Sequence, residues 1–159
     1  MVRIVEGIKL AKVVLSEPAF ECLVKHLVEI EEGKNKLLDE FFPRPSKERD
    51  EFEILLENYI KQVDELIRKV KKSSKAGNKL PFVTIGSEVE IQNLSDKETH
   101  KYRIITPFRG SVKDGDISYL SPVGKSLLLR KVGDVIEVKA PGGIFHYKIK
   151  SIRLQCGFT

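Results

Sequence analysis

Two prolines, Pro43 and Pro45, stand between two long stretches that have helical periodicity. Proline lacks an amide hydrogen and clashes with the preceding turn, so neither residue fits inside one continuous helix. Apolar residues recur at steps of three and four on both sides, at Phe20, Leu23, Leu27, Ile30, Leu37 and Phe41, and at Phe52, Leu56, Tyr59, Val63, Leu66 and Val70. Because such stripes pack lengthwise on each other, the sequence predicts an antiparallel helical hairpin with its turn near residues 43–46.

The middle of the first arm interrupts its apolar stripe. Lys34 occupies the skipped position, and Gly33 stands beside it. Glycine costs about 1 kcal/mol relative to alanine inside a helix. We therefore expect a local bend or a loosened seam at this point.

Beyond Pro81 the apolar period falls to two. Short alternating runs, separated by glycine-rich turns, include Val83 and Ile85, Val89 and Ile91, Tyr102 and Ile104, Val135, Ile136 and Val138, and Phe145, Tyr147 and Ile149. Ser121 and Pro122 predict the start of a short helix, because serine accepts a bond from a free amide and proline fits the first helical position. The whole pattern predicts an α+β chain: an N-terminal antiparallel coiled-coil hairpin, then an antiparallel β-sheet domain with one short helix.

Turn-forming residues and positive charge mark the boundary between the two halves. The stretch 71–79 contains lysines, serines and a glycine, and it ends the helical pattern. We expect four regions, namely an N-terminal extension at 1–14, the hairpin at 15–75, a linker at 76–82 and a C-terminal domain at 83–159.

Composition excludes several classes of protein. Charged residues interrupt every apolar stretch well short of a membrane span, and the first residues lack a clean signal core, so we expect a soluble, cytoplasmic protein with no membrane partner. Cys22 and Cys156 lack C-x-x-C spacing, which favours neither a zinc site nor a disulfide framework. The histidines are scattered, and no phosphate-binding glycine loop or nucleophile motif is present. The net charge of +5 permits an acidic partner.

An ordered run of turn and helix signals carries a family resemblance. It extends over residues 115–128 (GDISYLSPVGKSLL), then 132–134 (VGD) and 141–143 (PGG), and is joined by 86–89 (GSEV) and 102–104 (YRI). The run resembles the C-terminal domain of the bacterial GreA/GreB transcription elongation factors. That resemblance implies an FKBP-like C-terminal domain after a coiled-coil hairpin, and a monomer that binds bacterial RNA polymerase.

The resemblance also implies a mode of action. In that family the C-terminal domain docks at the rim of the polymerase secondary channel, and the hairpin enters the channel. The expected docking residues in this chain are Tyr119, Leu120, Ser121 and Pro122. The chain would then be an accessory factor rather than an enzyme, with only indirect contact with RNA and DNA. It would have no cofactor of its own, and any Mg²⁺ would be shared with the polymerase.

The expected hairpin tip keeps only part of the family pattern, an Asp followed three residues later by a Glu. Aligning the tip puts Glu48 at the Glu position and Pro45, which cannot bind a metal, at the Asp position. In a shifted register Glu48 and Glu51 have i,i+3 spacing and could share a helix face and a metal. Asp39, Glu40 and Asp50 complete the tip candidates.

The acidic residues at the tip also have a simpler interpretation. Carboxylates in a first helical turn favourably face the amide end of the helix. Arg44, Lys47 and Arg49 dilute the negative field that would recruit a cation. This tip fits a factor that modulates or inhibits the polymerase better than one that stimulates transcript cleavage.

Two alternatives of other classes remain. An FKBP-like fold raises peptidyl-prolyl isomerisation, which needs an aromatic-lined apolar pocket, although the chain contains no Trp. A nucleic-acid-binding coiled coil could use Arg68, Lys69, Lys71, Lys72 and Lys75, and its affinity would fall steeply with salt.

Overall fold

The computed structural model describes residues 13–75, 77–106 and 114–155. Most of the expected extension at 1–14, together with Cys156, lies outside these ranges. The chain divides into two compact units, Met1–Gly77 and Asn78–Thr159. In the part of the chain described, no helix combines the length and apolar character needed to span a bilayer.

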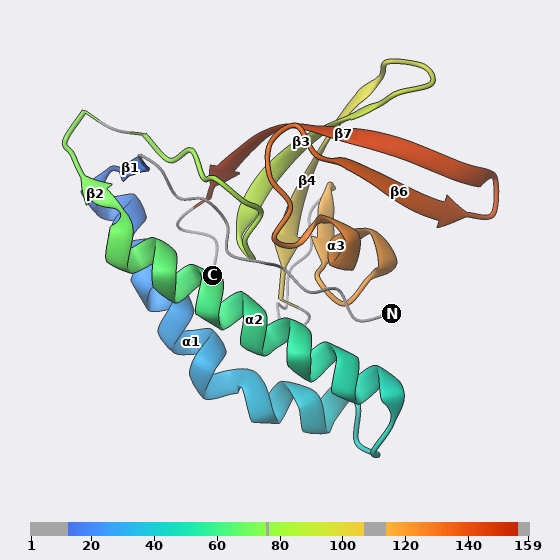
Figure 1. Cartoon of the computed structure of the whole chain (residues 1–159), viewed down its shortest axis with the longest axis horizontal. Helices are drawn as coiled ribbons and strands as arrows, with labels where there is room; N and C mark the ends of the chain where they lie inside the picture. The colour runs from blue at the N-terminus through green and yellow to red at the C-terminus, as the bar shows by residue number, and fades with distance from the viewer. Residues whose placement is uncertain (1–12, 76, 107–113, 156–159) are drawn as a thin grey trace. The chain divides into compact units, whose positions relative to one another are not determined.

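The first unit is the predicted helical hairpin. Helix α1 covers Glu17–Phe41 and helix α2 covers Lys47–Lys69. Figure 1 shows the two helices side by side, joined by a short turn. Each begins at a serine whose hydroxyl accepts a backbone amide: Ser16 from Ala19 at 3.3 Å, and Ser46 from Arg49 at 3.0 Å. The two turn prolines, Pro43 and Pro45, lie outside both helices, as their lack of an amide donor requires.

The seam between α1 and α2 is mostly apolar. The buried side chains facing it are Leu23, Leu27, Leu37, Leu38, Phe52, Leu56, Tyr59, Val63 and Leu66. Phe41, predicted to belong to the stripe, is 40% exposed, and Leu38 is buried at this end of α1 instead. Helix α1 runs through Gly33 without a break, and Lys34 pairs across the seam with Glu57 at 2.9 Å. An ion pair thus takes the place of the missing apolar contact.

A two-stranded parallel sheet closes the base of the hairpin. Strand β1, Val14–Leu15, pairs with β2, Lys71–Lys72. The Ser16 amide also donates to the Gly77 carbonyl at 3.0 Å. These bonds hold the segment that enters α1 beside the segment that leaves α2.

The second unit is built on a five-stranded sheet in the order β5-β4-β3-β7-β6. Its strands are β3 (Ser87–Asn93), β4 (Thr99–Ile105), β5 (Asp116–Ser118), β6 (Val135–Ala140) and β7 (Gly143–Leu154). All pairs are antiparallel except β4 with β5, which is parallel, so the predicted antiparallel sheet has one parallel edge. The short helix α3, Pro122–Leu127, follows β5 (Figure 1).

An extended segment before β3 lies in the core of this unit. Val83 and Ile85, predicted to alternate along a strand, belong to no strand, although Phe82 forms an isolated bridge with Lys131. Leu80 and the consecutive residues 82–85 are all buried, and Pro81 between them is half-buried. The Leu80 amide donates to the Ile152 carbonyl at 3.1 Å. The stretch expected to be a linker, 76–82, therefore contributes side chains to the core and backbone bonds to the edge of β7.

A partly buried polar pair lies between α1 and α2. His26 Nε2 and the Tyr59 hydroxyl are 2.7 Å apart, and the two rings meet edge to face. Tyr59 is completely buried. Burial lowers the pKa of His26 from 6.5 to about 4, because the surroundings disfavour the charged imidazole.

This pair predicts an acid-sensitive hairpin. Between pH 6.5 and about 4 the unfolded chain binds a proton at His26 that the folded chain does not bind, so the free energy of unfolding falls as the pH falls. The loss from this residue is at most about 3 kcal/mol. Urea denaturation of the full chain, followed by circular dichroism at pH 7 and pH 4.5, measures it. His26→Gln should show a smaller pH dependence, and an equal dependence in both proteins would contradict the assignment.

Candidate functional site

The turn between β5 and α3 is closed by two serines; we call residues 118–122 the β5–α3 loop. The Ser118 hydroxyl accepts the Leu120 amide at 3.0 Å. The Ser118 carbonyl accepts the Ser121 hydroxyl at 2.7 Å and the Ser121 amide at 3.0 Å. The Ser121 hydroxyl in turn accepts the Gly124 amide at 3.1 Å, which is the cap predicted from the sequence. The loop is thus fixed by bonds between its own residues.

A close backbone contact presses α3 onto the end of β5. A Cβ atom on Gly124 would lie 2.1 Å from the Ser118 carbonyl oxygen and 2.9 Å from the Tyr119 Cα. Both are backbone atoms, so a larger residue could be admitted only by moving the helix or the strand. Glycine at this position therefore sets how closely the helix approaches the loop.

The four expected docking residues differ in exposure. Tyr119 is 1% exposed, so its side chain is placed to support the loop rather than to contact a partner. Burial raises the pKa of its hydroxyl, and a side-chain hydrogen bond with Thr106 opposes part of that rise. Leu120 and Ser121 are half-buried, and Pro122 is exposed. Because Tyr119 is buried and the Ser121 hydroxyl is committed to the cap, Leu120 and Pro122 are the apolar side chains that these four residues leave accessible.

An ion pair fixes the short strand that leads into this loop. Arg103 donates two hydrogen bonds, each of 2.8 Å, to the two carboxylate oxygens of Asp116. The Asp116 side chain is only 3% exposed, and paired two-point contacts of this kind are strong and directional. Arg103 lies on β4 and Asp116 on β5, so the pair supports the parallel edge of the sheet. Both residues belong to the matching runs, but their contact was not predicted.

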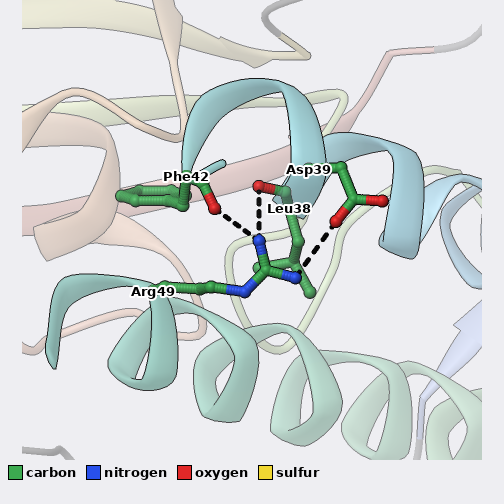
Figure 2. Close-up of polar contacts among 4 residues, drawn as sticks. All are labelled: Leu38, Asp39, Phe42 and Arg49. Atoms are coloured by element: carbon green, nitrogen blue, oxygen red, sulfur yellow. Dashed lines mark hydrogen bonds and ion pairs between the residues drawn. The ribbon is translucent and has the colours of Figure 1, made fainter. Parts of the chain in front are cut away.

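The other candidate region is the hairpin tip, which we define as residues 38–52. Figure 2 shows the Arg49 side chain of α2 reaching the end of α1. Its guanidinium donates to the Leu38 carbonyl at 3.1 Å and to the Phe42 carbonyl, and it pairs with Asp39 Oδ1 at 3.1 Å. The Leu38 carbonyl also accepts the Phe42 amide at 2.8 Å, and cations are favourable at the end of a helix. Arg49 therefore brings a positive charge and a second donor to the end of α1 from the neighbouring helix.

The tip carboxylates do not gather at one site. Asp39 is held by Arg49, and Glu51 Oε1 lies 3.9 Å from Lys47 Nζ. The remaining candidates, Glu40, Glu48 and Asp50, are exposed. Within residues 13–75, 77–106 and 114–155, no three or more His, Cys, Asp or Glu side chains are grouped so that they could hold a metal ion. The predicted pair Glu48 and Glu51 belongs to no such group.

Comparison with known proteins identifies the family. Residues 78–154 match the family model described as "Transcription elongation factor, GreA/GreB, C-term". Transcription elongation factor GreA of Rhodospirillum rubrum is 32% identical over 108 residues, which cover 68% of this chain and 67% of that relative. This chain belongs to the GreA/GreB family.

Other relatives match a shorter stretch of the chain with higher identity. GreA of Thermotoga neapolitana is 49% identical over 70 residues, and GreA of Thermotoga maritima has the same identity over the same length. These alignments cover 44% of this chain and 45% of each relative, so the chain spans less than half the length of these GreA proteins. Among solved structures, Gfh1 of Thermus aquaticus is 22% identical, covers 89% of this chain and 98% of that chain, and has a TM-score of 0.43. A GreA/GreB factor of Nitrosomonas europaea is 21% identical, with 90% and 98% covered and a TM-score of 0.48.

The close backbone contact at Gly124 predicts that adding one methyl group there strongly destabilises the second unit. Gly124→Ala should lower the free energy of unfolding of the second unit by about 3 kcal/mol, because the new Cβ overlaps the Ser118 carbonyl. Hydrogen exchange of the β3 and β7 amides in the full chain measures this change.

Gly142→Ala is the matched control in the same unit. Its Cβ would meet only the Phe145 ring, at 3.5 Å, so its effect should stay within about 0.5 kcal/mol. Equal exchange rates in the Gly124 and Gly142 variants would contradict the close contact.

Proposed function

We propose that this chain binds bacterial RNA polymerase through the β5–α3 loop and inserts its hairpin into the secondary channel, where it modulates elongation. The observation that carries the proposal is the family signature, which coincides with a rigid loop on the second unit. Gly124 and the two serines hold that loop, and Leu120 and Pro122 are its accessible side chains. A preorganised loop with apolar surface suits protein docking, because little conformational entropy is lost on binding.

The tip supports a modulating role rather than stimulation of transcript cleavage. Mg²⁺ prefers oxygen ligands and is commonly held by one or two carboxylates. Pro45 occupies the position of one expected carboxylate and has no ligand atom in its side chain. Asp39, one of two acidic residues near the end of α1, forms an ion pair with Arg49. We therefore infer a factor whose hairpin acts by occupying the channel, with no cofactor of its own.

Substitution of the half-buried loop leucine, Leu120, should weaken the complex with polymerase. Leu120→Arg is expected to reduce affinity at least tenfold, which corresponds to about 1.4 kcal/mol, because it places a charge in a desolvated contact. Competition of the full chain with a GreA factor for polymerase measures the affinity. Val135→Arg is the control, since Val135 is an exposed apolar residue of another element, β6. Failure of the unmodified chain to compete would refute the proposed partner.

Transcript cleavage tests the inferred role of the tip. In stalled elongation complexes with Mg²⁺, the full chain should leave the cleavage rate within about twofold of polymerase alone, a change below about 0.5 kcal/mol in barrier. Glu48→Ala should not alter that rate. Robust Mg²⁺-dependent cleavage that Glu48→Ala abolishes would show that the tip is a working cleavage tip.

A further inference from the structure

We propose that Arg49 is the positioning residue of the hairpin, fixing the conformation that the tip presents to its partner. The geometry of the tip carries this assignment, and its functional part rests on the proposal that the partner is RNA polymerase. Arg49 acts through the backbone of α1 and the turn, without itself being a contact residue.

The end of α1 lacks a cation of its own. No basic residue occupies the last turn of this helix, and the Leu38 carbonyl there accepts the Phe42 amide at 2.8 Å. Arg49 Nη1 donates to the carbonyls of Leu38 and Phe42, while Nη2 pairs with Asp39 (Figure 2). One planar guanidinium thus reaches three acceptors of α1 and the residue that follows it. The side chain is 24% exposed, so these bonds are only partly accessible to competing water.

The same residue is also fixed at its backbone. The Arg49 amide donates to the Ser46 hydroxyl, which caps the start of α2. Arg49 therefore joins the first turn of α2 to the last turn of α1, across the segment that contains both prolines. On the apolar side, the rings of Phe42 and Phe52 lie 5.3 Å apart. Polar and aromatic contacts together tie the turn to both helices.

Lysine cannot replace this arrangement. Its ammonium is a compact charge without the fixed planar fork of a guanidinium, so it cannot keep two carbonyls and a carboxylate in this geometry. A neutral glutamine loses the charge and most of the donors. The structure therefore predicts that geometry as well as charge determines the state of the tip.

Two measurements on the full chain test the proposal, with Arg44→Gln as the matched control. Arg44 is exposed, lies in the same turn, and forms no ion pair with a described residue. First, hydrogen exchange of the tip amides should quicken at least tenfold in both Arg49→Gln and Arg49→Lys, and should not change in Arg44→Gln. Unchanged exchange in Arg49→Gln, or equal changes in the Arg44 and Arg49 variants, would overturn the assignment.

Second, titration of each variant into elongation complexes separates positioning from binding. Arg49→Gln and Arg49→Lys should reduce the maximal effect on elongation rate at least twofold, while the half-maximal concentration stays within twofold. A raised half-maximal concentration with an unchanged maximum would make Arg49 a binding residue and overturn the proposal. Full activity of Arg49→Lys would do the same, because charge alone would then suffice.

A milder variant keeps the proposal testable if the Arg49 substitutions prevent the chain from folding. Asp39→Asn removes one partner from an exposed position and leaves the carbonyl contacts, so an intermediate change in exchange is expected; no change would contradict a role for the ion pair. If the unmodified chain has no effect on polymerase, the proposed function fails. The exchange experiment still decides the structural role of Arg49, so the two failures are distinguishable.

Discussion

Helix ends leave backbone amides and carbonyls without partners within the helix, and side chains bond to such groups at several helix ends of the described chain. Ser16, Ser46 and Ser121 each accept an amide at the start of a helix. Arg49 donates to the carbonyls of Leu38 and Phe42 at the end of α1. Because an unpaired buried backbone group costs about as much as a lost hydrogen bond, these few contacts determine where the helices begin and end. The positions of the tip and of the β5–α3 loop follow from them.

The two regions relevant to function share a way of being held. Neither the tip nor the β5–α3 loop has a large apolar core of its own, and each is fixed by bonds between side chains and backbone. In the loop these bonds come from Ser118 and Ser121, and a close approach of backbones at Gly124 completes it. In the tip they come from Ser46 and Arg49. Both regions can therefore be rigid while remaining at the surface.

Much of the fold was predictable because it depends on patterns among residues that are close together in the sequence. The helical stripes, the proline turn and the Ser121 cap could all be read from neighbouring residues. Contacts between residues that are distant in the chain could not. Arg49 was interpreted as a diluting charge because its acceptors lie on another helix, and the parallel pairing of β5 depends on a partner strand that pattern does not reveal. Residues 82–85 have an alternating pattern but are covered on all sides, which periodicity cannot distinguish from a strand.

The segment that begins at Asn78 determines where a chimera between two relatives can be joined. The Asn78 side chain donates to the Leu154 carbonyl at 2.7 Å, and the Leu154 amide donates to the Asn78 carbonyl at 2.8 Å. Leu80 and Phe82 then fill the core. A chimera joined after Pro81, where the sequence period changes, would take Asn78 and Leu80 from a different relative. If their bonds to Leu154 and Ile152 were lost, the edge of β7 would be exposed. A chimera joined before Asn78 would instead keep the whole segment with the second unit, including its bonds to β7. Hairpins with different tip residues could then be exchanged without changing the core of that unit.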